Sequence, residues 1–206
     1  MAFGSEFEQA RDFLILHRAD YAYAYEHFRW PERAHFNWAL DYFDSMSEGN
    51  NNTALWVVHE DGHEEKYSFA DLSGRSSQVA NYLTRLGLKR GDHVLLMLGE
   101  EVALWELMLA CMKIGAVMMP VSNLLSVDEL QDRLLRGEVK MIATTVANSK
   151  RFVVESATAL KLVVDGEVDG WSGYAEATRE SANFKPEGET KSSDPLLMYF
   201  TSGIAA

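Results

Sequence analysis

From residue 68 onward, the sequence alternates between segments with the apolar spacing of helices and short apolar runs of strand length. The clearest unit consists of the apolar run 93–98, the helical segment 101–114 and a second apolar run, 116–121. Continuously apolar strands are typical of parallel sheets, in which helices cover both faces. The pattern therefore predicts an α/β protein with a doubly wound, mostly parallel sheet and flanking helices.

Helix-start signals support this interpretation at two points. Ser68 has the residue type and position of an N-cap, and the helix after it stops near Gly87. Ser126 begins a second helix, with Glu129 in the capping-box position. The other elements that we predict in this part of the chain are strands at 140–145, 160–164 and 196–200 and a short helix at 149–157.

The first fifty residues are rich in aromatic side chains, and residues 36–43 have the spacing of an amphipathic helix. We interpret the aromatic stripe as a face that packs on the next domain, with a ligand platform as the less common alternative. Residues 54–59 and 65–69 flank an Asp-Gly pair, which predicts a β-hairpin. We therefore divide the chain into an N-terminal helical extension, residues 1–50, and an α/β subdomain, residues 51–206.

Composition limits the classes of partner. The chain has 31 acidic and 19 basic residues, and a formal net charge of −12 repels nucleic acids and anionic lipid surfaces. No apolar run reaches the roughly 20 residues of a membrane span, and the N-terminus lacks a signal-peptide pattern. The single cysteine, Cys111, excludes an intramolecular disulfide and lies among apolar residues, as expected of a buried structural thiol. We expect a protein of the reducing cytoplasm.

The most informative segment for chemistry joins the apolar run 196–200 directly to Thr201, Ser202 and Gly203. A glycine-containing turn lets backbone N–H groups converge on an anion, and the two hydroxyls add further donors. The segment therefore predicts a phosphate-binding loop. For so short a motif, an ordinary turn after a strand is the alternative.

Residues 199–203 resemble the Tyr-x-Thr-Ser-Gly-Thr-Thr-Gly loop of the AMP-binding, adenylate-forming superfamily. That superfamily includes acyl-CoA synthetases, adenylation domains of peptide synthetases and luciferases. Residues 67–72 resemble the opening of its first long helix, and residues 86–94 resemble its Gly-Asp-x-Val turn. Residues 113–122 resemble its Gly-Ala-x-x-x-Pro signature, and residues 125–134 the Leu-Ser-x-x-Glu-Leu helix that follows.

The resemblance extends over residues 50–203, and residues 36–41 are also similar to medium-chain acyl-CoA synthetases. It implies an enzyme that uses ATP and Mg²⁺ to convert a small-molecule carboxylic acid into an acyl-adenylate and then transfers the acyl group to CoA. Thr201, Ser202 and Gly203 are the residues that carry over as cofactor-binding residues.

The sequence departs from the family after Gly203, where residues 204–206 stand in place of Thr-Thr-Gly. The family's magnesium-binding glutamate, ribose-binding aspartate and C-terminal lysine have no counterpart here, so we assign no catalytic and no metal-binding residue. We expect the N-terminal fragment of an acyl-CoA synthetase that is inactive by itself. Two alternatives stay open: a fragment of an adenylation domain that loads a carrier protein, and a non-catalytic α/β interaction module. A homo-oligomer is also possible.

Two other sets of polar residues are better explained by structural roles than by metal binding or acid/base catalysis. His59, Glu60, Asp61 and His63 could form a metal cluster, but they lie at the predicted hairpin tip, where a solvated turn is the commoner explanation. The adjacent carboxylates at 64–65 and 100–101 are expected to point in different directions, unlike an acid/base pair that flanks a substrate.

Overall fold

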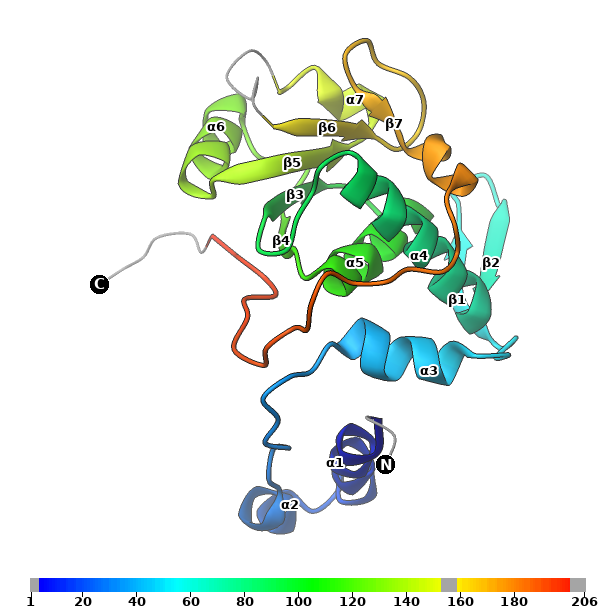
Figure 1. The fold of residues 1–206 in the computed structure, drawn as a ribbon, viewed down its shortest axis with the longest axis vertical. Coiled ribbons are helices and arrows are strands. Elements are labelled where there is room, and N and C mark those ends of the chain that lie inside the picture. The colour runs from blue at the N-terminus through cyan, green and yellow to red at the C-terminus, as the bar shows by residue number, and fades with distance from the viewer. Residues whose placement is uncertain (1–3, 153–158, 201–206) are drawn as a thin grey trace.

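The structure is a computed structural model that describes residues 4–152 and 159–200 (Figure 1). Its central sheet has the strand order β4-β3-β5-β6-β7, and every neighbouring pair is parallel. These strands are β3 (His93–Met97), β4 (Val117–Pro120), β5 (Val139–Thr144), β6 (Leu160–Val163) and β7 (Ser172–Gly173). The chain passes from β3 to β4 on one side and then crosses to β5 on the other, so the predicted doubly wound α/β fold is confirmed.

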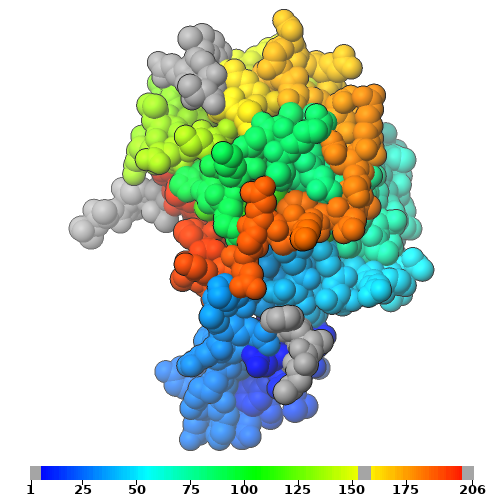
Figure 2. Space-filling model, viewed as in Figure 1, coloured from blue at the N-terminus to red at the C-terminus, as the bar shows by residue number. Residues whose placement is uncertain are grey.

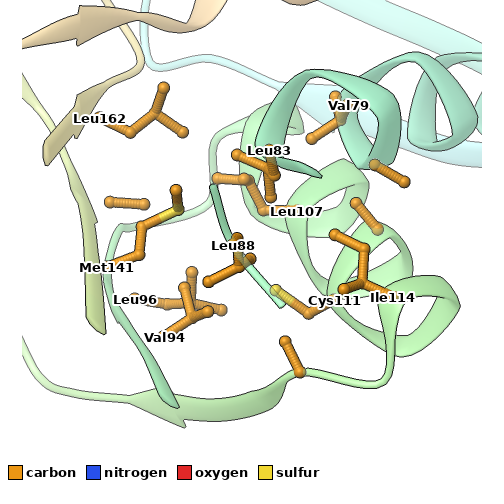
Figure 3. Close-up of a cluster of buried hydrophobic side chains, with 14 of the residues drawn as sticks. Val79, Leu83, Leu88, Val94, Leu96, Leu107, Cys111, Ile114, Met141 and Leu162 are labelled. Carbon is orange, nitrogen blue, oxygen red and sulfur yellow. The ribbon is translucent and has the colours of Figure 1, made fainter. Parts of the chain in front are cut away.

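Helices cover both faces of this sheet because alternate strand residues point in opposite directions. Val94 and Leu96 of β3 pack against α4 (Phe69–Arg85) and α5 (Val102–Ile114), in the apolar cluster of Figure 3. Leu95 and Met97 of the same strand pack against Leu130 of α6 (Val127–Arg136) on the opposite face. The short helix α7 (Val146–Ser149) follows β5. The continuous apolar run at 93–98 is thus explained by burial on two faces.

The two predicted N-caps are confirmed with complete capping boxes. The Ser68 side chain accepts a hydrogen bond from the Asp71 backbone N–H, and the Asp71 side chain accepts one from the Ser68 backbone in return. Ser126 and Glu129 make the same reciprocal pair at the start of α6. Each arrangement satisfies N–H groups that the first helical turn leaves without a partner.

The N-terminal part contains α1 (Gly4–Leu16), α2 (Tyr21–His27), the π-helix η1 (Trp38–Phe43) and α3 (Asp44–Ser47). Ala39 and Phe43 of η1 are buried in a cluster with Leu72 of α4 and Leu109 of α5. Residues 38–43 therefore pack on the α/β part, as the first interpretation stated, whereas Tyr21, Tyr25 and Trp30 of the same aromatic region are 79%, 78% and 77% exposed. The antiparallel hairpin is also confirmed, as β1 (Thr53–Val58) and β2 (Glu64–Ser68).

Two expectations need correction, and two elements were not predicted. The predicted strand at 196–200 is reduced to one isolated parallel bridge between Leu197 and Met118 of β4. A buried parallel strand needs cover on both faces, whereas Leu196, Leu197 and Tyr199 are 45%, 41% and 64% exposed. The helix expected at 149–157 lies earlier in the chain, as α7, and residues 153–157 of that range lie outside the described residues. The sequence did not predict β7 or the 3₁₀ helix η2 (Tyr174–Arg179).

No helix in the described ranges combines the length and the apolar character that a membrane span requires.

Candidate phosphate-binding segment and its supports

The predicted phosphate-binding residues, Thr201, Ser202 and Gly203, lie outside the described residues. The structure does describe the segment that leads to them. The Met118 N–H donates to the Leu196 carbonyl at 3.0 Å, and the Met198 N–H donates to the Met118 carbonyl at 2.9 Å. These bonds align residues 196–198 in parallel with β4. The segment therefore runs toward the edge at which the sheet strands end, where α/β proteins commonly bind ligands.

The segment lies on the surface of the molecule (Figure 2). At its described end, the Phe200 ring lies against the guanidinium groups of Arg133 and Arg136 of α6, at 4.3 and 5.3 Å from the ring centroid. Both arginines also pair with Asp132, at 2.7 and 3.4 Å. Two cationic side chains thus lie beside the last residue before the predicted loop, and Asp132 partly neutralises them.

Arg90 holds the connection that precedes the segment. Its guanidinium donates to the Glu187 and Gly188 carbonyls at 3.3 and 3.1 Å and to the Thr190 hydroxyl at 3.0 Å. It also lies 3.8 Å from the Asp194 carboxylate. A planar group with five donors can make these contacts together, which a lysine ammonium cannot do with the same geometry. Arg90 therefore fixes residues 187–194 against the sheet.

This contact gives two of the signature motifs one common structural role. Gly115 ends α5 with φ +80°, and a Cβ atom at this position would lie 2.5 Å from Nη1 of Arg90. The Gly91 N–H donates to the Gly115 carbonyl at 2.9 Å, which joins the turn before β3 to the turn before β4. Gly91, with φ +78°, is therefore explained by its backbone conformation, and Gly115 by its backbone conformation and by the space that Arg90 occupies. These residues position the segment.

Asn37 links the N-terminal part of the chain to residues 187–194, the segment that Arg90 also holds. Its side-chain N–H groups donate to the Met112 carbonyl at 2.6 Å and to the Thr190 hydroxyl at 2.9 Å. Its side-chain oxygen accepts from the backbone N–H groups of Ala39 and Leu40 and so caps η1. Beside it lies a mostly apolar cavity of about 250 Å³, whose walls include Phe36, Trp38, Met112, Ala116, Pro195 and Leu196.

Buried charges between the helices were not anticipated from the sequence. Glu106 of α5 is 1% exposed, and its carboxylate accepts hydrogen bonds from the Arg75 guanidinium and the Tyr174 hydroxyl. Burial and the adjacent Glu106 carboxylate raise the pKa of Tyr174. Charged residues inside an otherwise apolar helix are the signal that could have revealed this network.

Lys113 of α5 is also fully buried, and its ammonium lies 2.8 Å from the Asp44 carboxylate. It donates further to the Ser77 hydroxyl at 2.8 Å and to the Ser73 carbonyl at 3.0 Å. Burial lowers the pKa of Lys113, and the Asp44 carboxylate counteracts part of that shift. All these partners come from α3 and α4, so Lys113 links these two helices to α5. Lys113 is not among the residues that line the cavity beside Asn37.

Cys111 is buried, as predicted, and burial raises the pKa of its thiol to about 12. A thiol in this state is not a nucleophile at neutral pH. The adjacent carboxylates of the hairpin also behave as expected. Glu64 accepts from the Trp56 indole, whereas Glu65 contacts His59 and Tyr67, so the two point to different faces.

At the hairpin tip, the structure brings together a different set from the one that the sequence suggested. Ligand atoms of His59, His63 and Glu65 all lie within 4.8 Å of one another. Asp61 instead accepts a hydrogen bond from the His63 backbone, and Glu60 is exposed. Strand pairing places Glu65 near the histidines, which local sequence order does not indicate.

Comparison with known proteins agrees with this architecture. The sequence matches a family model described as AMP-binding enzyme over residues 44–204. It is 35% identical over 185 residues to the mitochondrial acyl-coenzyme A synthetase ACSM4 of Mus musculus, over 84% of this chain and 32% of that protein. It is 33% identical over 175 residues to 4-hydroxybutyrate–CoA ligase 1 of Metallosphaera sedula, over 82% of this chain and 30% of that protein.

The chain therefore spans about a third of the length of the curated relatives that it matches. Among solved structures, an acyl-CoA synthetase of Brucella canis superposes with a TM-score of 0.76 at 23% identity, over 90% of this chain and 35% of that one. This likeness establishes a shared fold. Because the mouse relative is named as mitochondrial, the cytoplasmic location expected from the single cysteine stays a prediction.

Proposed function

The chain belongs to the AMP-binding enzyme family, and we propose that it forms the N-terminal third of an ATP-dependent acyl-CoA synthetase. In the complete enzyme, a substrate carboxylate oxygen attacks the α-phosphorus of ATP and pyrophosphate leaves. The CoA thiol then attacks the acyl carbon, and AMP leaves as the acyl-CoA thioester forms. The family match over residues 44–204 carries this proposal, because it spans the α/β unit and the predicted phosphate loop together.

Within that enzyme, this chain contributes a scaffold and part of one binding site. Thr201, Ser202 and Gly203 are assigned to the nucleotide phosphates on residue type, since hydroxyl and backbone N–H donors suit an anion. Arg90 and Asn37 act as positioning residues, because they hold the connection at 187–194 from which the loop follows. The boundary between an extension, 1–50, and the α/β subdomain, 51–206, is part of the same proposal.

The residues described do not supply a site for Mg²⁺. Magnesium prefers oxygen ligands in octahedral geometry, whereas the one group of three potential ligands within residues 4–152 and 159–200 contains two imidazoles. No reaction step is therefore assigned to a metal held by these residues. CoA, rather than a carrier protein, is the favoured acyl acceptor because both relatives named above are CoA ligases or synthetases.

We further propose that the 206 residues do not catalyse the reaction by themselves. The test measures pyrophosphate release with ATP, Mg²⁺, CoA and a medium-chain fatty acid. One sample is the 206-residue chain, and a second is a chimera in which the remainder of the mouse relative follows residue 203. Circular dichroism and a cooperative melting curve verify that both are folded.

The expected result is no turnover by the chain alone and fatty-acid-dependent pyrophosphate release by the chimera. In the chimera, Thr201→Ala with Ser202→Ala should lower the rate at least tenfold, since each hydroxyl that loses a charged partner costs about 1.5–3 kcal/mol. Turnover by the 206 residues alone would contradict the proposed inactivity. A folded chimera whose rate is insensitive to the double substitution would overturn the phosphate-loop assignment.

A further inference from the structure

The tip of the β1–β2 hairpin presents three potential metal ligands on one face. Val57 of β1 pairs with Glu65 of β2, so these two residues share a face of the hairpin. His59 and His63 are each two residues farther toward the tip, which returns their side chains to that same face. The His59 N–H donates to the His63 carbonyl at 2.8 Å and continues the pairing into the turn.

The ligand atoms of these residues already lie close together. Nε2 of His59 is 2.8 Å from Oε1 of Glu65, and the two imidazole rings stack with centroids 5.5 Å apart. All three ligand atoms fall within 4.8 Å of one another. Ligands about 2.1 Å from a tetrahedral zinc ion are separated by about 3.4 Å, so rotations of these side chains can complete the site. Both histidines are exposed, which leaves an entry path.

A second layer of hydrogen bonds orients the ligands. The Tyr67 hydroxyl donates to Oε2 of Glu65 at 2.7 Å, which leaves Oε1 directed at the histidines. The Asp61 carboxylate accepts from the His63 backbone N–H at 2.9 Å and fixes the turn. Natural zinc sites commonly hold their ligating side chains by such outer contacts.

We propose that His59, His63 and Glu65 bind one Zn²⁺ ion, with water in the fourth position. Two imidazoles and one carboxylate suit zinc, and they do not suit the hard cations Mg²⁺ and Ca²⁺. Within the described ranges, no other three His, Cys, Asp or Glu side chains gather in this way. The site is separate from the acyl-CoA synthetase reaction, since the hairpin and residues 196–200 lie on opposite sides of the molecule (Figure 1).

The bound ion would bridge the two strands at the tip and so stabilise the hairpin. A two-stranded hairpin gains little stability from its own pairing, so a cross-strand metal adds an interaction at the end farthest from α4. Stabilisation then follows from ligand binding to the folded state alone. We expect Zn²⁺ to raise the melting temperature of the untagged 206-residue chain and to protect the hairpin amides from hydrogen exchange.

The primary test is calorimetric titration of Zn²⁺ into the untagged chain, compared with His59→Ala/His63→Ala and with the control His17→Ala/His27→Ala. The control removes the same number of histidines from the N-terminal part, one just after α1 and one at the end of α2. One site is expected in the parent and in the control, and its affinity should fall more than tenfold in the hairpin variant. Absence of a stoichiometric site in the parent, or equal losses in both variants, would overturn the proposal.

Two further measurements separate ligation from a general effect on folding. Bound Co²⁺ should give tetrahedral d–d absorption without a thiolate charge-transfer band, since Cys111 is 0% exposed. Glu65→Gln should weaken binding more than Tyr67→Phe, because Glu65 supplies a ligand atom and Tyr67 only orients it. A six-coordinate Co²⁺ spectrum that none of these substitutions changes would contradict the site.

Discussion

Two parts of the molecule that adjoin the sheet are held in different ways. The layer of α4 and α5 buries a continuous apolar cluster against β3, β4 and β5 (Figure 3). It also contains two ion pairs, each with one buried partner. The segment at 196–200 is attached to β4 by two backbone hydrogen bonds and keeps its large apolar side chains half exposed. The first is therefore part of the folding core, whereas the second depends on its anchors. Ligand-binding segments are commonly of this less stable kind.

The largest expected contrast comes from truncating one leucine in each part. Leu107 of α5 is 0% exposed and Leu197 is 41% exposed. Leu107→Ala should lower the free energy of unfolding by about 3–4 kcal/mol, because it removes buried methyl groups and leaves a cavity. Leu197→Ala should lower the free energy of unfolding by about 1 kcal/mol, since part of the side chain stays in water and its removal leaves no enclosed cavity. Urea denaturation of both variants checks this, and equal losses would abolish the distinction between the two parts.

The buried carboxylate gives the next effect. Glu106→Gln leaves the Arg75 guanidinium without its counter-ion and should destabilise the fold by about 3 kcal/mol. The control is Glu176→Gln, which removes an ion pair to Arg179 whose side chains are 45% and 77% exposed. That change should cost less than about 0.5 kcal/mol. A small loss for Glu106→Gln would mean that solvent reaches the pair, since the Arg75 side chain is 39% exposed.

Arg90 tests the anchor of the exposed segment. Arg90→Ala removes three hydrogen bonds to residues 187–190, and about 1.5 kcal/mol of local stability should be lost. Trypsin should then cleave after Lys191 about tenfold faster, while the cooperative unfolding transition moves little. Arg18→Ala, at an exposed position of the N-terminal part, is the control. If the Arg90→Ala variant were cleaved at the parent rate, the contacts of residues 34–37 with residues 190–192 would suffice to hold the connection.

Cys111 gives a pH-dependent effect that belongs only to the core. Burial raises the folded-state pKa of its thiol from 9.0 to about 12, so the folded state retains the proton where the unfolded state loses it. Its contribution is complete below pH 9 and declines by about 1.4 kcal/mol per pH unit between pH 9 and 12. Cys111→Ala should remove this slope from urea denaturation measured at pH 8.5, 9.5 and 10. An identical slope in both proteins would contradict a buried thiol.

The sequence determined most of the local structure in the core. Strands β3 to β6 begin and end within a residue or two of the predicted positions, because apolar runs and N-cap residues act over short distances. The same reasoning failed at 196–200, since the apolar run predicts a buried strand only if other elements cover it. The family resemblance came from short ordered motifs, and the match over residues 44–204 confirmed it.

The contacts between distant residues were decided only by tertiary structure. Asp44 reaches Lys113, Glu65 joins His59 and His63, and Arg90 meets Thr190 because folding brings separate elements together. A charge in an apolar helix shows that some partner is needed, yet its identity depends on helix packing. The sequence alone thus determined the alternation of elements and the family, since both reside in local patterns. Which polar groups pair, hold a distant segment or gather at the hairpin tip depended on the three-dimensional arrangement.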